Sequence, residues 1–260
     1  MGDDLEKPAS GVSFNWHDRF LQQARWTIAI RQSLYQRANL ASARRVIEIG
    51  SGTGVLTGEL VGYTRAVSFG LEIDPDRLQQ AKKFDPRTRF IAGDAYHTPF
   101  SSQQFDLAFC HYFLLWASQP VDAIREMRRL TRHGGSVLAL AEPDYGGRID
   151  YPTPLEQIGL MQIESLRRQG ADPYIGRKLA DFFHQAGLIQ VETGVLGGLW
   201  TQTEDVASLQ SEWDTLAQDL QLTGETVDLP FLKAMDIDAR QSGKRILFVP
   251  TFYAWGIVPD

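Results

Sequence analysis

The sequence of 260 residues has little of several features, and each scarcity excludes a class of protein. Cys110 is the only cysteine, so the chain cannot be a disulfide-stabilised scaffold. No stretch approaches the ~18 consecutive apolar residues that span a bilayer. The first residues, 1–8, are polar and acidic and lack the apolar core of a secretory signal. We therefore expect a cytoplasmic protein with no membrane partner.

Positive charge and metal ligands are also scarce. The chain has 26 Lys and Arg against 32 Asp and Glu, which gives a net charge of -6. A protein that neutralises phosphates needs the opposite balance, so we expect no nucleic-acid partner. The five histidines show no ligand spacing, and we predict no metal site. A composition of 43% hydrophobic and 22% charged residues is that of an ordinary globular protein.

The first half of the sequence alternates short β-branched runs with helical stretches. The expected strands are 45–49, 66–73, 89–92, 105–110 and 136–141, and the expected helices between them are 55–61, 76–83 and 121–130. Strands that alternate with helices form βαβ units and a mainly parallel sheet, so the predicted fold class is α/β.

The second half of the sequence is less regular. Further helices are expected at 154–168, 177–186 and 203–220, a strand at 189–195, and a closing strand at 245–258. Pro250 lies inside that closing run, and proline is tolerated in a strand only at an edge, a start or a bulge. No linker separates two units, so we predict a single domain over residues 1–260.

A glycine-rich loop, Glu48-Ile49-Gly50-Ser51-Gly52-Thr53-Gly54, follows the first strand and precedes a helix. Its glycines permit turns and close backbone approach to a ligand, and a helix start offers free N–H groups to an anion. Val55 stands where the dinucleotide fingerprint has its third glycine, and no Gly-Lys-Ser/Thr of a phosphate-binding Walker loop follows. Both common nucleotide interpretations are therefore weakened.

Two carboxylates follow the next strands. Glu72 ends the second strand, where an acid can accept both ribose hydroxyls of an adenosine. Asp94 follows the third strand, where an acid can accept a hydrogen bond from an adenine amino group. Because parallel strands end at one edge of a sheet, these acids and the glycine loop should form one binding rim.

Loop and acids together resemble the class I S-adenosylmethionine-dependent methyltransferases, over residues 44–141 and again in the last strand. This resemblance implies a Rossmann-like three-layer sandwich with a seven-stranded, mostly parallel sheet whose last strand is antiparallel, plus helical lid additions. It implies S-adenosyl-L-methionine as the cofactor. The cofactor-binding residues that it predicts are Glu48, Gly50, Ser51, Gly52, Gly54, Glu72, Ile73, Asp94, Ala95 and His111.

The same resemblance divides the domain into parts with separate tasks. Residues 44–142 are the expected cofactor-binding core and 10–40 an N-terminal helical cap. Residues 151–175 and 200–235 are acceptor-side helical additions. Their aromatic side chains, with Tyr145 nearby, fit an apolar or aromatic small-molecule acceptor with an O-, N- or C-nucleophile.

The catalytic residues are harder to predict, because the family has no single catalytic signature. The end of the fourth strand, 109–113, lacks the Asn/Asp-Pro-Pro-Tyr/Phe stretch of enzymes that methylate exocyclic amines, and Cys110 lacks the preceding proline of cytosine-C5 enzymes. His111 is the candidate general base, with a structural histidine as the alternative. Tyr145 is the second catalytic candidate.

Two other functions remain open from the sequence. A non-catalytic regulatory subunit would bind S-adenosylmethionine and methylate nothing. An NAD-dependent oxidoreductase would need the third glycine that Val55 replaces. The sequence does not predict the oligomeric state.

Overall fold

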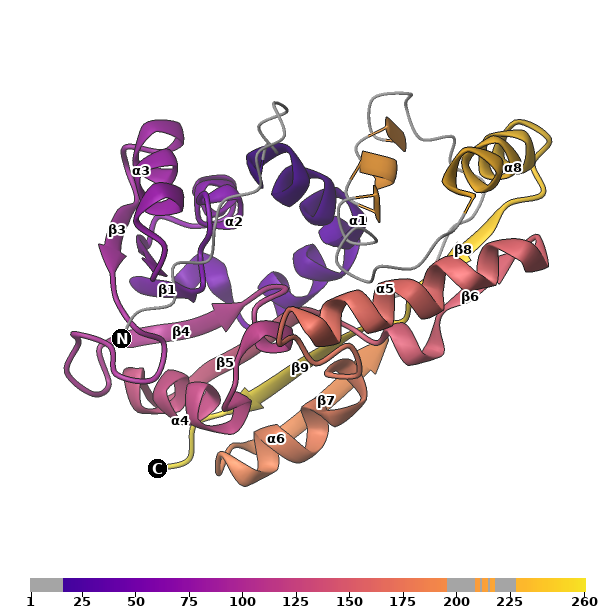
Figure 1. Cartoon of the computed structure of the whole chain (residues 1–260). Coiled ribbons are helices and arrows are strands. Elements are labelled where there is room, and N and C mark those ends of the chain that lie inside the picture. Colours follow the sequence, from indigo (N-terminus) through magenta and orange to yellow (C-terminus); the bar gives the residue numbers. More distant parts are fainter. Residues whose placement is uncertain (1–15, 196–208, 211, 215, 218–227) are drawn as a thin grey trace, which may run out of the picture.

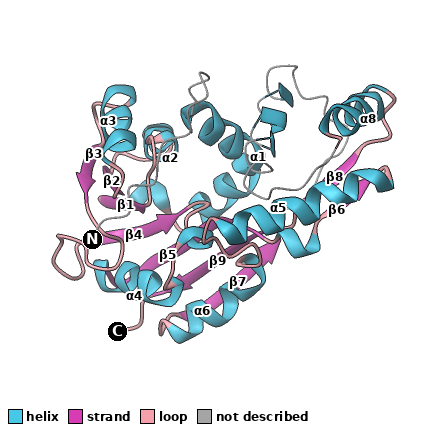
Figure 2. Cartoon of the chain, in the orientation of Figure 1, coloured by secondary structure: helices cyan, strands magenta, loops and turns pink. Residues whose placement is uncertain are grey.

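A seven-stranded sheet lies at the centre of the molecule, with helices packed on both of its faces (Figures 1 and 2). The computed structural model describes residues 16–195, 209–210, 212–214, 216–217 and 228–260. In sheet order the strands are β3 (Arg89–Ala92), β2 (Val67–Glu72), β1 (Arg45–Ile49), β4 (Phe105–Cys110), β5 (Thr131–Pro143), β9 (Thr251–Ile257) and β7 (Ile189–Val195).

The directions of the strands agree with the predicted fold. Strands β3, β2, β1, β4 and β5 pair in parallel, whereas β9 is antiparallel to both of its neighbours, β5 and β7. The predicted α/β class with a seven-stranded, mostly parallel sheet and an antiparallel last strand is confirmed. Because β1, β2 and β4 are largely buried on both faces, their sequences are near-continuous apolar runs.

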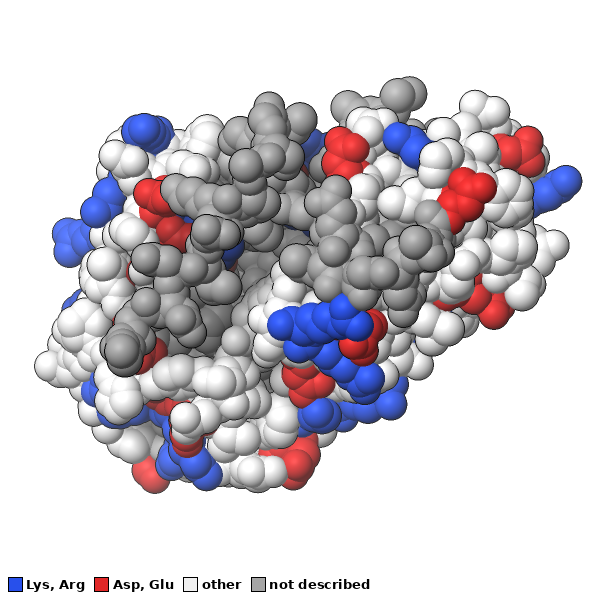
Figure 3. All heavy atoms as spheres, in the orientation of Figure 1, with Lys and Arg blue, Asp and Glu red and all other residues white. Residues whose placement is uncertain are grey.

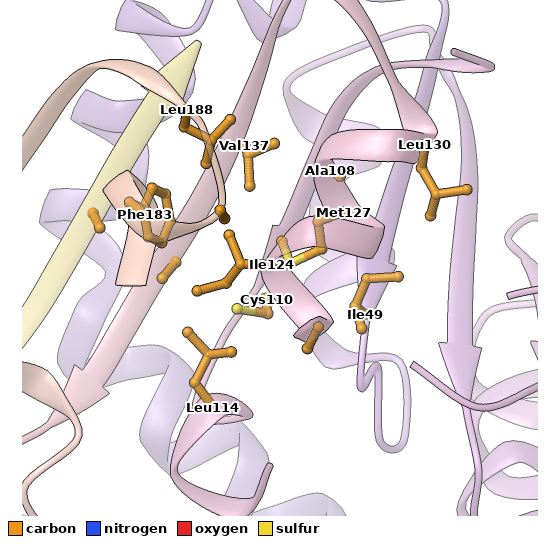
Figure 4. Close-up of a cluster of buried hydrophobic side chains, with 14 of the residues drawn as sticks. Ile49, Ala108, Cys110, Leu114, Ile124, Met127, Leu130, Val137, Phe183 and Leu188 are labelled. Atoms are coloured by element: carbon orange, nitrogen blue, oxygen red, sulfur yellow. The ribbon is translucent and has the colours of Figure 1, made fainter. Parts of the chain in front are cut away.

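Two layers of helices cover the sheet. Helices α1 (Trp16–Arg37) and α2 (Val55–Glu59) pack on one face, and α4 (Pro120–Leu130) and α6 (Leu179–Gln185) on the other. Side chains alternate along each strand, so in β1 Val46 faces the first layer and Ile49 faces the second. Figure 4 shows the second core, in which Cys110 lies among Ile124, Met127 and Phe183. Cys110 is fully buried, as expected for a strand residue.

The helix between β2 and β3 shows how sequence fixes an element's start. Helix α3 (Pro75–Phe84) begins with proline, whose fixed φ suits the first helical position. Asp74 is its cap, because its carboxylate accepts hydrogen bonds from the N–H groups of Asp76 and Arg77. Asp76 therefore lies in the first turn.

Several predicted boundaries are wrong. The predicted closing strand 245–258 is two strands, because Pro250 interrupts the run: β8 (Ile246–Phe248) ends before it and β9 begins directly after it. Strand β8 pairs with β6 (Ile149–Tyr151), a strand that the sequence did not predict, in a second, two-stranded sheet. The predicted helix 203–220 lies mostly outside the described residues.

The acceptor-side additions have a core of their own. Helices α5 (Glu156–Arg168) and α8 (Leu229–Gln241) contribute to it, and none of its members comes from the large sheet. Its buried members are Leu155, Ile158, Met161, Trp213, Leu216 and Leu232. Helix α8 was not predicted as a separate helix and runs beyond the predicted limit of 235.

A buried ion network joins the small sheet to α8. Arg245 contacts two carboxylates, with Nη2 2.7 Å from Asp150 Oδ1 and Nε 2.5 Å from Asp236 Oδ1. Arg148 Nε lies 2.5 Å from the other oxygen of Asp150. Trp213 Nε1 donates to Asp236 at 3.1 Å. The side chains of Arg245, Asp150 and Asp236 are 6% exposed or less, so each charge depends on the others.

Candidate active site

Five predicted site features line one edge of the sheet. Asp94, Glu72, the glycine loop, His111 and Tyr145 follow the carboxyl ends of β3, β2, β1, β4 and β5 respectively, and these strands are neighbours in that order. In a parallel sheet, ligands bind outside these strand ends. The fold therefore brings together the acids predicted to hold an adenosine and the side chains predicted to meet an acceptor.

The glycine loop needs its glycines. Gly50, Gly52 and Gly54 have φ values of 71°, 53° and 79°, the left-handed region that other residues adopt at a cost. Aromatic rings also fill the space that a side chain would need: a Cβ atom on Gly52 would lie 2.7 Å from the ring of Phe20. The ring of Phe113 lies closer still to the position of a Cβ atom on Gly50. Both positions therefore exclude a larger residue.

Glu72 ties the loop to the second strand. Its Oε2 accepts a hydrogen bond from the Gly52 N–H at 2.7 Å, and Oε1 accepts from the N–H groups of Ile73 and Asp74, both at 2.9 Å. Two carboxylate oxygens offer about four acceptor positions. The predicted ribose acid therefore already fixes the loop and keeps capacity for one further donor.

Asp94 is the more open of the two acids. Its Oδ1 accepts from the Tyr96 N–H at 2.9 Å, and its side chain is 49% exposed. The other oxygen, Oδ2, lies 4.0 Å from His97 Nδ1, beyond hydrogen-bond range. One oxygen is thus available to an amino group. Of the other two predicted contacts on this rim, Ile73 is 72% exposed and Ala95 packs against the core.

Two members of the loop, Glu48 and Ser51, are buried. Glu48 Oε2 and Ser51 Oγ have no hydrogen-bond partner among the described residues. Burial raises the pKa of Glu48 to about 8. Glu48 is therefore neutral at pH 7, and its predicted contact with the cofactor stays a prediction.

The first turn of α1 covers the glycine loop. His17 Nδ1 lies 2.8 Å from Thr53 Oγ1, and its ring stacks on Phe84 of α3 with 3.6 Å between ring centroids. Phe20 lies against Gly52, and the Arg77 guanidinium is 5.7 Å from the Phe20 ring. The predicted N-terminal cap thus contacts the loop through side chains rather than lying apart from it.

The segment after β4 is held from below by Glu142. This fully buried carboxylate accepts hydrogen bonds from the backbone N–H groups of Phe113, Leu114 and Leu115 at 3.0, 3.0 and 3.2 Å. Burial raises its pKa to about 7, and the three N–H groups oppose that rise. Glu142 fixes the path of the chain next to His111, a task that its sequence position alone did not indicate.

His111 is partly buried and contacts α1. Its Nε2 lies 2.8 Å from Thr27 Oγ1, and its ring meets the Tyr112 ring edge-on at 4.8 Å between centroids. Burial and the positive charge of Arg31 lower the pKa of His111 well below its usual value. The predicted base is therefore neutral at pH 7, and it is a weaker base than an ordinary histidine.

Tyr112 and Tyr145 lie near each other at the same edge. Tyr112 has a φ of 50°, a strained conformation for a residue with a side chain, and its N–H donates to the Ala141 carbonyl at 2.9 Å. Burial and then the neighbouring Tyr145 raise its pKa. Asp144, beside Tyr145, is occupied by a two-point ion pair with Arg177 at 2.5 and 2.7 Å.

The sequence interpretation missed the contact of two α1 residues, Thr27 and Arg31, with the site. Arg31 is fully buried, and its guanidinium contacts Glu59 and the Thr27 hydroxyl. The spacing Ala24, Thr27, Arg31, Leu34 places Arg31 on the buried face of the helix, and this was the available signal.

The described residues form neither a cluster of metal ligands nor a membrane-spanning helix. No group of three or more His, Cys, Asp or Glu there could hold a metal ion. No helix in that part of the chain is long and apolar enough to cross a membrane. The predicted absence of a metal stays a prediction.

Comparison with known proteins finds similarity to methyltransferases. Residues 47–139 match the family described as methyltransferase domain. The malonyl-[acyl-carrier protein] O-methyltransferase of Halorhodospira halophila is 33% identical over 99 residues, which are 36% of this chain and 34% of that protein. Matches to the first three curated relatives cover 34%, 68% and 53% of their own lengths.

Solved structures share the fold over nearly the whole chain. The Haloferax volcanii protein solved with the Trm112 methyltransferase activator has a TM-score of 0.61 and 17% identity, over 94% of this chain and 95% of that one. A Haemonchus contortus phosphoethanolamine N-methyltransferase solved with S-adenosylhomocysteine has a TM-score of 0.58 and 16% identity, over 91% of this chain and 53% of that one. Residues 47–139 therefore resemble a methyltransferase domain, and these solved structures share the fold of the whole chain.

Proposed function

We propose that the protein transfers a methyl group from S-adenosyl-L-methionine to a small-molecule acceptor. The observation that carries the proposal is the arrangement of the glycine loop, Glu72 and Asp94 on adjacent strand ends. Glu72 bonds the loop directly, so the two parts of the predicted site form one wall. The aligned relatives, which are named methyltransferases, support the same activity.

The residues at this edge fit the predicted cofactor. Asp94 Oδ2, free of hydrogen bonds to the described chain, suits the adenine amino group. Glu72 has one acceptor position left for a ribose hydroxyl. The cofactor, when bound, supplies an electrophilic methyl group on a sulfonium. Every other task, from enclosing the reactants to orienting the acceptor, falls to this chain.

The chain's contribution is mainly positioning. Holding a nucleophile in line with a reactive methyl group supplies much of the rate of such a transfer. Glu142 fixes the backbone after β4, and the tyrosines 112 and 145 lie beside it, where an acceptor would meet the cofactor site. The acceptor we propose is apolar or aromatic over most of its surface.

The distribution of surface charge does not favour a nucleic acid as the methyl acceptor. Figure 3 shows basic side chains beside acidic ones on the face drawn, rather than a continuous basic stripe. Several arginines of the described structure are paired with carboxylates, for example Arg168 with Glu164 and Arg177 with Asp144. We therefore keep nucleic acid out of the proposed partners.

Calorimetric titration tests the proposal. We expect S-adenosylmethionine and S-adenosylhomocysteine to bind with micromolar affinity and NAD not to bind. Glu72→Ala should weaken binding by at least about 100-fold, since it removes the ribose acceptor and the bond to Gly52. Unchanged affinity in Glu72→Ala would overturn the ribose assignment, and binding of NAD alone would favour the oxidoreductase.

Turnover separates the enzyme from a regulatory subunit. The released S-adenosylhomocysteine is measured while panels of carboxylates, phenols and amines are offered as acceptors. Product from one panel supports the enzyme and names its acceptor class. Tight cofactor binding without product from any panel would support the non-catalytic alternative.

A further inference from the structure

A chain of polar side chains connects α2 to the predicted catalytic histidine. Glu59 pairs with the guanidinium of Arg31, and Arg31 Nη1 donates to the Thr27 hydroxyl. Thr27 Oγ1 lies 2.8 Å from His111 Nε2. Three separate elements, α2, α1 and the end of β4, thus meet through side chains of which only His111 is a predicted cofactor contact.

Arg31 is an unusual residue for a helix face against a sheet. Its side chain is 1% exposed, and its partner Glu59 is 19% exposed. A buried ion pair often contributes less stability than apolar residues of the same volume. Stability alone therefore does not explain a guanidinium at this place. The other contact of Arg31, with Thr27, indicates a further role.

The hydrogen-bond distances around Thr27 indicate the protonation of His111. The Thr27 hydroxyl has one hydrogen to donate, and its oxygen already accepts from Arg31. Its three possible acceptors are His111 Nε2 at 2.8 Å, the Gln23 carbonyl at 3.2 Å and the Ala24 carbonyl at 3.4 Å. Nε2 is the closest of the three, and donation to it leaves the imidazole proton on Nδ1. The competing arrangement, in which Nε2–H donates to Thr27 and the hydroxyl donates to the Gln23 carbonyl, is the one that the experiment below must exclude.

The charges around His111 act in the same direction. Burial lowers the pKa of His111, and the positive charge of Arg31 lowers it further. Protonated His111 would place a second positive charge next to Thr27, whose oxygen already faces a guanidinium. His111 Nδ1 makes no hydrogen bond to the described residues, so its N–H remains available.

We infer that Thr27 and Arg31 are positioning residues that hold His111 as the neutral Nδ1–H tautomer, which donates a hydrogen bond to the methyl acceptor instead of acting as its base. This inference rests on the proposed function. A neutral imidazole that donates is a known way to use a histidine whose protonation is suppressed.

The role of His111 as a donor restricts the acceptor. Without a base, the nucleophile must need no deprotonation, and a hydrogen-bond donor suits an oxygen that is already anionic. The chemical class we assign is therefore a carboxylate, or another oxygen ionised at neutral pH. Its lone pair forms the new O–CH₃ bond, the C–S bond breaks with its electron pair going to sulfur, and no proton leaves the acceptor.

Nitrogen NMR of the histidine rings tests this tautomer in the S-adenosylhomocysteine-bound protein. A His111→Gln spectrum identifies the His111 signals among the five histidines. In the native protein we expect a protonated Nδ1 and an unprotonated Nε2 at pH 6 to 8. Thr27→Val removes the hydroxyl at constant volume and should shift His111 toward the Nε2–H form, whereas Thr27→Ser should retain the native pattern.

Each outcome decides something separate. Nε2–H or a charged imidazole in the native protein at pH 7 would overturn the inference, and so would Thr27→Val with the native pattern. Circular dichroism of both Thr27 variants checks that they fold. Calorimetry on the same samples measures S-adenosylhomocysteine binding. Binding of S-adenosylhomocysteine together with the wrong tautomer would overturn only the inference. The predicted tautomer without binding of S-adenosylhomocysteine would overturn the proposed function.

Turnover of two His111 variants gives a second readout once an acceptor is found. For a donor, His111→Asn, whose amide can donate near the Nδ1 position but cannot act as a base, should retain more activity than His111→Ala. An equal loss of activity in the two variants would restore the general base.

Discussion

The cofactor-side core and the acceptor-side additions are stabilised in different ways. In the core, β1, β2 and β4 are buried between two helix layers by apolar side chains such as Ile47 and Leu107. The additions have a small apolar core and depend on Arg148, Arg245 and their buried carboxylates. Apolar packing tolerates small adjustments, whereas a buried ion network fails when one partner is lost. The comparison predicts that one region can be damaged without the other.

The largest expected effect comes from breaking the buried network. Arg245→Met removes one of the two arginines that pair with each of Asp150 and Asp236, which keep Arg148 and Arg240, and should lower the free energy of unfolding by about 3 kcal/mol. Chemical denaturation measures the loss. Arg168→Met removes an exposed ion pair with Glu164 and should cost less than about 1 kcal/mol. Equal losses in the two variants would contradict the importance of burial.

A substitution in the glycine loop should instead destabilise the cofactor-side core and weaken cofactor binding. Gly52→Ala places a methyl group 2.7 Å from the Phe20 ring at a positive φ, and we expect a cost of about 2–3 kcal/mol. Affinity for S-adenosylhomocysteine, measured by calorimetry, should fall at least about 10-fold. Gly62→Ala meets no atom within 4 Å and is the matched control. If both variants bind equally well, the loop is more adaptable than its contacts indicate.

The buried acid of the core should appear in the pH dependence of stability. Glu48 binds a proton more tightly when folded, with a pKa of about 8, than the ordinary value of 4.5. Its contribution is therefore complete below pH 4.5 and is lost as the pH rises toward 8. Glu48→Gln should match the native protein at pH 5 and exceed it at pH 8.5, by on the order of 2 kcal/mol. A native-like decline in the variant would exclude Glu48 as the source.

The smallest expected effect tests the outer acid of the rim. Asp94→Asn places an amide where the adenine amino group needs an acceptor, and binding should weaken about 10-fold, or about 1.4 kcal/mol. Because Asp94 is half exposed, the free energy of unfolding should stay within about 0.5 kcal/mol. Asp122→Asn, on α4, serves as the control. A fully native affinity in Asp94→Asn would remove this acid from the cofactor site.

The same two regions explain what the sequence could predict. Periodicity and the glycine loop predicted β1 to β5 because each short apolar run and each turn acts locally. Helix α8, β6 and the break at Pro250 depend on partners distant in sequence, such as the pairing of Asp150 with Arg245, and no local pattern reports them. In the site, the strand ends predicted Glu72 and Asp94. The link from Arg31 to His111 required two elements 80 residues apart to be placed side by side.

The place of β9 in the sheet has a consequence for biosynthesis. This strand lies between β5 and β7, although about a hundred residues of chain come between β5 and β9. While the chain emerges from the ribosome, β5 and β7 each present an unpaired edge until β9 has been translated, and such edges pair readily with other strands. Contacts of this sequence separation also form slowly. We expect the nascent protein to depend on chaperones more than its apolar core would suggest, and to gain its acceptor side only in the final step of sheet closure.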